Sequence, residues 1–368
     1  MNELPGAPPA PAAGFFITPH GFGHASRASA VIEALQDTHP TLRLEIFTTV
    51  PRWYFERSVD CFGYHELDCD LGLVQTDALS VDIPATLTAL AKRLPFDSRL
   101  IERLAQQVTV LGCRIVVCDI APLGVAVAAA ASIPSVLVEN FTWDWIYRSY
   151  RPASIALSAY GKMLAPYFAG ANLHIQTAPT CRPDPAALQV GPVSRRRQQD
   201  SAATRFAMGG TPERPLVLIS MGGVPQAFPF IERLRSDFAD IDFVIAGVHD
   251  TGQLPGNVTL LAADTKLHHP SMVHAADAVI GKVGYSTIAE VYEAGTPFGY
   301  FVRADYPEMP PLLAFLRDHI HGHCFQADAW ARGEWLARLR DLLQMPRVPR
   351  APSGHGASQC AALIGRLL

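Results

Sequence analysis

Short apolar runs alternate with amphipathic stretches along most of the chain. Runs of four or five apolar residues are typical of strands buried on both faces, and the stretches between them carry apolar residues three or four positions apart, as helices do. This alternation predicts βαβ units and parallel sheets covered by helices on both faces. In the first half we expect strands at 15–18, 44–48, 115–118 and 135–138, and helices at 24–36, 98–111, 124–131 and 154–168.

The same alternation restarts after a polar stretch at 191–214, which carries the arginine run Arg195–Arg197. We interpret these arginines as the solvated face of a linker. The predicted elements that follow are strands at 216–220, 243–246, 258–261, 278–280 and 298–302, and helices at 226–236, 287–294, 309–318, 328–343 and 357–368.

Two such halves predict an α/β protein built from two Rossmann-like βαβ domains that face a central cleft. Small molecules bind such sheets beyond the carboxyl ends of the strands, so the cleft is the expected site. The predicted organisation is a disordered lead-in at 1–13, an N-terminal domain at 14–195, a linker at 196–213, a C-terminal domain at 214–345, and a C-terminal helix within 346–368 that packs back on the N-terminal domain.

Composition limits the classes of partner. The 368 residues carry 30 Lys+Arg and 34 Asp+Glu, so there is no basic field of the kind that attracts nucleic acid. The most apolar stretch is interrupted by Asp119, Pro122 and Pro134, which predicts a chain without integral membrane association. Seven scattered cysteines without a CxxC pair predict reduced thiols and a cytoplasmic protein. Composition leaves the oligomeric state open.

The loop after the first predicted strand combines glycines with histidines. Gly21 and Gly23 allow a tight turn and bring backbone N–H groups close to a ligand. His20 and His24 bracket them at a strand end that faces the cleft. An ordinary turn between strand and helix also accounts for these residues. A metal held by the two histidines is disfavoured, because the intervening glycines break the helical turn that would pair them.

Two glycine loops in the second half indicate a phosphate site. Gly222 and Gly223 follow the first strand of that half, and a further glycine loop leads into a helix capped by Ser286 or Thr287. The free N–H groups and the positive dipole end at such a helix start can hold a phosphate. Ordinary glycine turns are the alternative.

Glu290 lies one turn into this helix and admits two interpretations. Thr287 and Glu290 have the spacing of a capping box, in which the glutamate reaches back to its own helix N-terminus. Alternatively, the carboxylate accepts hydrogen bonds from the two hydroxyls of a ribose.

These motifs resemble those of GT-B glycosyltransferases, which carry a glycine loop with a histidine after the first strand and a G-x-S/T-T-x-x-E-x-x-x-x-G-x-P pattern in the donor domain. The corresponding segments are HGFGH (20–24) and GYSTIAEVYEAGTP (284–297). The donor half is similar to the peptidoglycan N-acetylglucosaminyltransferase and to plant UDP-sugar transferases.

A further resemblance is to the N-terminal, glycosyltransferase-like region of plant L-arabinokinases. It rests on HGFGHASR, the strand that ends at Asp119, NFTWDWIY (140–147) and GKVGYST (281–287). It covers about residues 14–345, with the motifs in the same order.

The resemblance implies roles by position. His24 matches the loop histidine that many inverting members use as general base, and Asp119 matches the aspartate that orients it. His20, which is not a feature of the family, is the candidate base if His24 is not. Glu290 matches the ribose-binding carboxylate, and Lys266 lies near the base-binding loop by position only. From the loops and the resemblance together we expect the nucleotide-sugar site to comprise Gly21, Gly23, Gly222, Gly223, Lys266, Lys282, Gly284, Ser286, Thr287, Glu290 and Glu308, of which Lys282 is not a general feature of the family.

Aromatic residues crowd the segment after the strand at 135–138. They could belong to the core, as most aromatic clusters do, or form a platform for an acceptor. Asn140 and Asp144 are interleaved with them, so Trp143 and Trp145 are candidate acceptor-binding residues.

These observations predict a metal-independent, inverting glycosyltransferase that needs no cofactor beyond its co-substrate, a nucleotide-diphosphate sugar. UDP is the preferred nucleotide, and the partners are a small-molecule donor and a small-molecule acceptor. Two alternatives stay open: a nucleotide-sugar epimerase or hydrolase of the same fold, and a non-catalytic sugar-nucleotide sensor.

Overall fold

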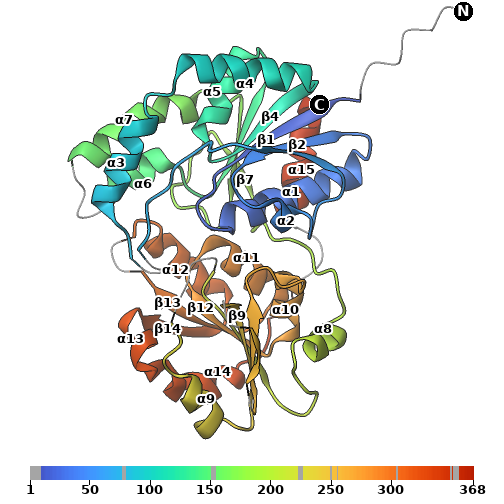
Figure 1. Ribbon diagram of the computed structural model, residues 1–368, viewed down its shortest axis with the longest axis vertical. Helices are drawn as coiled ribbons and strands as arrows, with labels where there is room; N and C mark the ends of the chain where they lie inside the picture. Colours follow the sequence, from blue (N-terminus) through green and yellow to red (C-terminus); the bar gives the residue numbers. More distant parts are fainter. Residues whose placement is uncertain are drawn as a thin grey trace, which may run out of the picture.

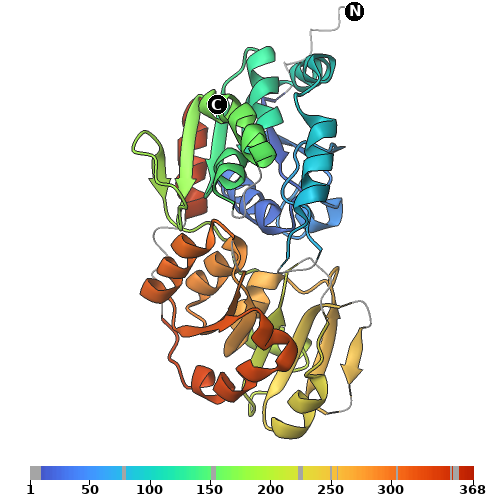
Figure 2. The same ribbon diagram turned by 90° about the vertical axis from the view of Figure 1, so that its left-hand side faces the viewer.

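The computed structural model describes residues 10–76, 80–150, 155–222, 227–248, 251–254, 256–303, 306–348, 350 and 356–368. The chain forms two halves, each a largely parallel sheet with helices on both faces, stacked along the long axis (Figures 1 and 2). The predicted α/β fold with two Rossmann-like domains is therefore confirmed.

The first sheet has the order β3-β2-β1-β4-β5-β6-β7, with neighbouring strands parallel. The chain changes its direction of winding between β1 and β4, and ligands bind α/β sheets at such a switch point. The strands are β1 (Ala12–Ile17), β2 (Arg43–Thr48), β3 (Phe62–Glu66), β4 (Cys113–Asp119), β5 (Ser135–Glu139), β6 (Leu173–Thr177) and β7 (Leu188–Val190).

Helices cover both faces of this sheet. Alternate residues of β4 point to opposite layers: Val117 packs on the side of α1, while Val116 and Cys118 pack on the side of α5. The helices of this half are α1 (Gly23–Thr38), α2 (Arg52–Phe55), α3 (Ile83–Arg93), α4 (Ser98–Val110), α5 (Pro122–Ala130), α6 (Trp143–Ser149) and α7 (Ile155–Ala169).

The second sheet has the order β10-β11-β9-β8-β12-β13-β14, in which β10 is antiparallel and the other strands are parallel. Its switch point lies between β8 and β12. The strands are β8 (Leu216–Ser220), β9 (Asp242–Val248), β10 (Gly252–Leu254), β11 (Val258–Ala262), β12 (Ala278–Lys282), β13 (Phe298–Val302) and β14 (Gly322–Gln326).

The helices after β7 cover the second sheet, except that α15 returns to the first half. There Ala357, Cys360 and Ile364 of α15 complete the core beside α1, and this helix lies in the upper half of Figure 1. These helices are α8 (Ser201–Ala207), α9 (Ile231–Asp237), α10 (His269–Ala275), α11 (Tyr285–Ala294), α12 (Met309–His319), α13 (Asp328–Arg332), α14 (Leu339–Leu343) and α15 (Gly356–Ile364), with the 3-10 helices η1 (Glu334–Arg338) and η2 (Gly365–Leu367).

Three of the differences between the structure and the predicted elements concern where an element begins, lies or ends. β1 begins at Ala12, inside the predicted lead-in, because two small alanines fit between β2 and β4. The stretch predicted as a linker contains α8. The helix predicted at 328–343 is broken at Gly333, whose left-handed φ of +63° ends α13 and separates it from η1 and α14.

Candidate functional site

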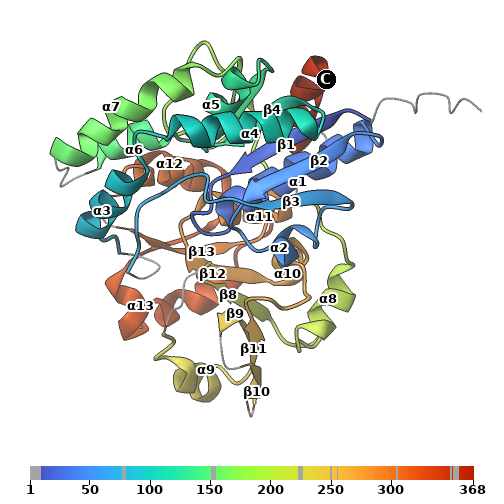
Figure 3. The ribbon, with the colours of Figure 1, turned by 45° about the horizontal axis from the view of Figure 1, so that its top comes forward.

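The helices α1 and α11 begin at the two switch points and approach each other across the cleft. α1 follows β1, and α11 follows β12. A Cβ atom on Gly23 would lie 3.7 Å from Ser286 Oγ, so the two helix N-termini lie close together (Figure 3). Free N–H groups and the positive ends of two helix dipoles therefore converge on one region, which favours an anion.

His24 and Asp119 form a buried pair in the first half. His24 Nδ1 lies 2.8 Å from Asp119 Oδ1, and the two residues are 7% and 3% exposed. Arg27 donates to the same carboxylate, from Nε to Oδ2 at 2.8 Å and from Nη2 to Oδ1 at 2.7 Å. Its Nη1 donates to Asn140 Oδ1 at 2.6 Å. The carboxylate is thus fixed by Arg27 and in turn orients the imidazole of His24.

This environment sets the charge of each partner. Burial lowers the pKa of His24 below 6.5, and the neighbouring Asp119 opposes this only in part. Burial also opposes ionisation of Asp119, but the Arg27 guanidinium holds the pKa of that carboxyl below its usual range. His24 is therefore neutral at pH 7, with Nδ1–H donated to Asp119 and Nε2 left as an acceptor. Such an imidazole can take a proton from a ligand hydroxyl.

His20 has a different environment. Its ring packs against Gly72, and its edge meets Trp143 with the ring centroids 5.2 Å apart. Burial lowers its pKa well below 6.5, and the nearby His24 and Arg303 add to this effect. Within the described residues no carboxylate is paired with His20. The geometry therefore favours His24 as the proton acceptor.

Both halves line the space in front of His24, which we call the His24 pocket. Lys282 and Arg303 contribute positive charge from the second half. Arg303 is paired with Glu308, which is 4% exposed, and its guanidinium lies 3.8 Å from the ring centroid of Tyr306. The predicted site residues that line this pocket are His20, Gly21, Gly23, His24, Gly222, Lys282, Gly284, Ser286, Thr287 and Glu308.

A second pocket, the Glu290 pocket, adjoins the first. The two share Phe22, Gly222, Ser286 and Thr287. Apolar side chains form much of the wall of the Glu290 pocket, among them Ala246, Ala262, Leu267 and Met272. The two pockets therefore make one cleft with a charged end and a more apolar end.

Glu290 is buried at the second pocket and engaged at both oxygens. Its Oε1 accepts from Arg195 Nη2 at 3.1 Å, and its Oε2 is paired with His269 Nδ1. His269 Nε2 lies 2.9 Å from Ser220 Oγ. Burial opposes ionisation of Glu290, but His269 and Arg195 lower its pKa to about 2. The pocket wall therefore carries a fixed negative group at neutral pH.

These contacts exclude one of the two interpretations of Glu290. The N-cap of α11 is Gly284, and no side chain caps the helix. The capping box predicted from Thr287 and Glu290 is therefore wrong, because the helix begins two residues before Thr287 and the carboxylate turns to Arg195 and His269.

The expected solvated face at Arg195–Arg197 is also corrected. Arg195 is only 5% exposed, and its guanidinium lies 5.0 Å from the ring centroid of Tyr54 in addition to its pairing with Glu290. Arg196 and Arg197 remain exposed. A buried carboxylate and an aromatic face compensate for the charge of the buried Arg195.

Comparisons with known proteins were made for sequence and for structure. No protein-family model matches the chain. L-arabinokinase of Arabidopsis thaliana is 30% identical over 315 residues, which are 81% of this chain and 29% of that protein, so the chain spans less than a third of its relative.

Solved structures match over nearly the whole chain. The calicheamicin glycosyltransferase CalG4 covers 97% of this chain and 98% of its own, with a TM-score of 0.65 and 17% identity. UGT71G1 of Medicago truncatula, solved with UDP-glucose, covers 97% and 98%, with a TM-score of 0.60 and 11% identity. MurG of Acinetobacter baumannii covers 97% and 99%, with a TM-score of 0.55 and 16% identity. The chain has the GT-B fold. The resemblances to glycosyltransferases of this fold and to the L-arabinokinases are thus confirmed.

Two residues of the predicted nucleotide-sugar site are not among those that line the two pockets of this GT-B fold. Gly223 lies outside the described residues, whereas Gly222 adopts the left-handed φ of +81° that a turn after β8 requires. Lys266 is exposed and does not line the Glu290 pocket, because its neighbours Thr265 and Leu267 point there instead.

The two tryptophans predicted to bind the acceptor lie in different environments. Trp143 is 0% exposed, and its Nε1 donates to Asp70 Oδ2 at 2.7 Å, so it belongs to the core and not to a platform. Thr18 also donates to this oxygen. Trp145 is half-buried and lines a separate pocket of the first half.

Sequence inspection missed several residues of the GT-B cleft. His269, Ser220 and Arg195 are joined through Glu290, and Tyr54 lines the same pocket. The sequence could have indicated Ser220, because it is the last residue of a strand of the second sheet and ligands bind at such strand ends. His269 and Arg195 lie in polar stretches without a motif, so only the fold brings them to the site.

Two further tests concern only the described residues. Among them, no three His, Cys, Asp or Glu side chains are grouped so that they could hold a metal ion. None of the helices that the structure describes has the length and apolar character needed to cross a bilayer.

Proposed function

We propose that the chain is a metal-independent, inverting glycosyltransferase that moves a sugar from a nucleoside diphosphate sugar, preferably UDP-linked, to an acceptor hydroxyl. The observation that carries the proposal is the His24–Asp119 pair, because His24 lines one pocket together with the N-termini of α1 and α11. A proton acceptor and an anion site are thereby adjacent, as this reaction requires.

The proposed base is His24. Its Nε2 takes the proton of the acceptor hydroxyl while the hydroxyl oxygen bonds to the anomeric carbon of the donor. Asp119 keeps the ring in the tautomer that leaves Nε2 free and stabilises the imidazolium that forms. Arg27 keeps Asp119 ionised throughout.

The bond between the anomeric carbon and the phosphate oxygen breaks at the same time, and the diphosphate leaves with the electron pair. The N–H groups at the starts of α1 and α11 are placed to meet this negative charge, with Lys282 and Arg303 beside them. Such fixed donors stabilise a leaving anion without reorganisation.

The Glu290 pocket is the proposed place of the nucleoside. Its apolar wall suits a base, and Glu290 is ionised and able to accept from ribose hydroxyls through the lone pairs that Arg195 and His269 leave open. The UDP-glucose held by UGT71G1 and the likeness in fold support a nucleotide sugar as donor.

The epimerase or hydrolase alternative requires additional free carboxylates at the cleft. Asp119 is engaged by Arg27 and His24, Glu308 by Arg303, and Glu139 lies at a different pocket. These contacts favour transfer over that alternative.

The first experiment is a thermal-shift panel of UDP-, GDP- and TDP-sugars. A nucleotide sugar that binds the folded chain raises its melting temperature. With the stabilising donor, release of nucleoside diphosphate is then measured for wild type and for His24→Ala across a panel of hydroxyl acceptors. We expect the variant to bind the donor normally by calorimetry while transfer falls at least about 100-fold.

The matched control is His321→Ala, an exposed histidine away from the cleft, which should keep full activity. Unchanged turnover in His24→Ala would remove His24 as the base and leave His20 to be tested in the same way. A chain that binds the donor tightly but releases no product in any mixture would be a sensor.

A further inference from the structure

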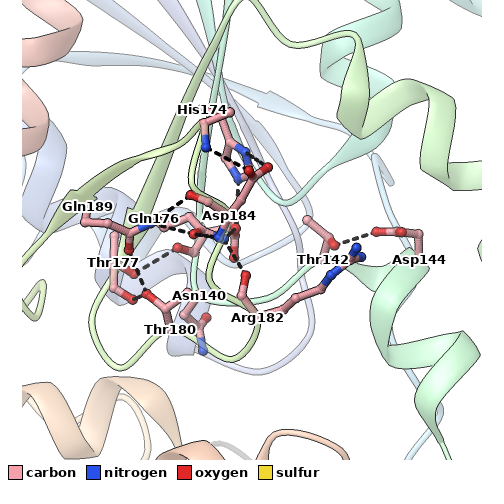
Figure 4. Close-up of polar contacts among 12 residues, drawn as sticks. Asn140, Thr142, Asp144, His174, Gln176, Thr177, Thr180, Arg182, Asp184 and Gln189 are labelled. Atoms are coloured by element: carbon pink, nitrogen blue, oxygen red, sulfur yellow. Dashed lines mark hydrogen bonds and ion pairs between the residues drawn. The ribbon is translucent and has the colours of Figure 1, made fainter.

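A separate pocket of about 380 Å³ lies in the first half, between the carboxyl ends of β5 and β6, helices α6 and α7, and the loop that leads to β7 (Figure 4). We call it the Glu139 pocket. Of the residues around it, Phe141 also lines the His24 pocket, and the ring centroids of Phe141 and His24 are 5.9 Å apart. The two pockets are therefore neighbours on either side of one aromatic ring.

The walls of this pocket are held by a dense set of hydrogen bonds. Gln176 Nε2 donates to Glu139 Oε1 at 2.6 Å and to the carbonyl of Arg182 at 2.9 Å, while its Oε1 accepts from Asp184 N at 2.8 Å and from Gln189 Nε2 at 2.6 Å. All four hydrogen-bonding positions of this amide thus tie the loop to the sheet. The pocket is pre-formed.

One polar atom at this pocket is left without a partner. Glu139 is 2% exposed; its Oε1 accepts from Gln176 and is also 2.8 Å from His174 Nε2, but its Oε2 has no hydrogen-bond partner among the described residues. A buried carboxylate oxygen without a donor is unfavourable. A ligand with an O–H or N–H group would supply the missing donor.

The charges around the pocket nearly cancel. Carboxylates come from Glu139, Asp144 and Asp184, and guanidinium groups come from Arg148 and Arg182. Asp144 is already paired with Arg148. In Figure 4 the side chain of Arg182 extends from the loop towards Thr142 and Asp144. A ligand here meets both acceptors and donors, and the three carboxylates exceed the two guanidinium groups by one charge, which disfavours an anion.

Aromatic side chains complete the wall. Trp145 is half-buried, and Phe141 and Phe168 lie beside it. A half-exposed indole next to paired donors and acceptors suits the C–H face of a sugar ring, whose hydroxyls both donate and accept.

We propose that the Glu139 pocket binds a neutral, hydroxyl-rich group, the sugar or polyol portion of the acceptor. An apolar acceptor would leave Glu139 Oε2 unpaired, and an anion would meet that carboxylate directly. The assignment of the ligand as an acceptor rests on the proposed function, whereas its chemical class rests on the pocket alone.

The test measures binding of neutral sugars (D-glucose, D-galactose, D-xylose and L-arabinose) to the full chain by saturation-transfer NMR and calorimetry. D-glucosamine, D-glucuronate and inorganic phosphate serve as charged comparisons. At least one neutral sugar should bind, and Glu139→Gln, Arg182→Ala and Trp145→Ala should each weaken it by about 10-fold or more, since each removes a contact to the ligand. Arg182 is exposed, so its variant is expected to fold normally.

Matched controls are Glu102→Gln and Phe206→Ala, at exposed positions away from the pocket, which should bind as the wild type does. Binding of no neutral sugar, preference for a charged comparison, or affinities unchanged in all three pocket variants would overturn the proposal. UDP binding is measured in parallel. A chain that binds sugars but no nucleotide contradicts the proposed function and leaves the pocket assignment standing. A chain that binds UDP but no neutral sugar contradicts the pocket assignment and leaves the proposed function standing.

Discussion

Burial sets the protonation of His24, and this has a kinetic consequence. The ring is 7% exposed, and its pKa lies below 6.5 because the charged form is poorly solvated. Asp119 supports the imidazolium without restoring the ordinary value. The base is therefore ready at neutral pH, and the proton it takes is held by a carboxylate that Arg27 keeps ionised.

We expect the rate of transfer to stay on its plateau as the pH falls to 6.5 and to decline only below it. The group that titrates is a histidine with a lowered pKa, which is active when neutral and becomes protonated only at more acid pH. The check is kcat/KM between pH 5 and 8 at constant ionic strength, because that parameter reports the free enzyme. An acid limb centred at or above 6.5 would contradict this assignment.

At this scale the sequence predicted the residues that stand at strand ends or in the glycine turns that follow them. His24, Asp119 and Ser286 belong to this group, since a strand end followed by a tight turn has few alternatives in space. Arg195 could not be predicted, because a run of three arginines does not say which one meets a buried carboxylate 95 positions later. Trp143 was placed wrongly because its partner, Asp70, lies in a loop far away in sequence.

At the scale of the elements, Arg195 in the segment after β7 is linked by side-chain contacts to two helices of the second half, α11 and α10. Arg195 binds Glu290 on α11, and Glu290 binds His269 at the start of α10. A chain segment between the two sheets is thereby fixed to the wall of the Glu290 pocket.

Replacing Arg195 by alanine should lower the free energy of unfolding by about 3 kcal/mol. The buried carboxylate of Glu290 then keeps only one of its two partners, His269. Urea denaturation gives the value. The matched control is Arg196→Ala, whose side chain is 49% exposed and paired only at the surface, with an expected change below about 0.5 kcal/mol. Equal losses in the two variants would show that Arg195 has no special role.

Elements buried on both faces were the most predictable. β8 and β13 match the predicted ranges, because an apolar run bounded by turn residues leaves little freedom. The strands β3, at the edge of the first sheet, and β6, next to its other edge, were missed, since each mixes polar side chains with half-exposed positions and lacks a clear period. α10 begins with His-Pro and is short, so its helical pattern is weak in sequence.

The core of the first half is completed by a helix that follows the second half in the sequence. α15 follows the entire second half but packs against α1, and Ile364 is 0% exposed there. Two halves were predictable from the repeated alternation of strands and helices. The individual contacts across the predicted cleft were not predictable, because they come from single residues such as Tyr150 and Tyr306, whose ring centroids are 6.2 Å apart.

Ile364→Ala should therefore destabilise the first half, although the residue lies at the end of the chain. Loss of a fully buried isoleucine costs about 2–5 kcal/mol. The measurement is thermal or urea unfolding, and Leu367→Ala is the control because Leu367 is 39% exposed in the same segment. A variant as stable as the control would mean that α15 is not needed for this core.

The position of α15 also fixes an order of events during synthesis. Translation delivers β1 and α1 first, but the layer that covers α1 is made of residues 356–364. The apolar surface beside α1 must stay uncovered while the whole second half is made, until that segment has left the ribosome tunnel. The first half is therefore synthesised before the second half, but its core is completed after it. A chaperone that shields exposed apolar surface would act on the first half during that interval.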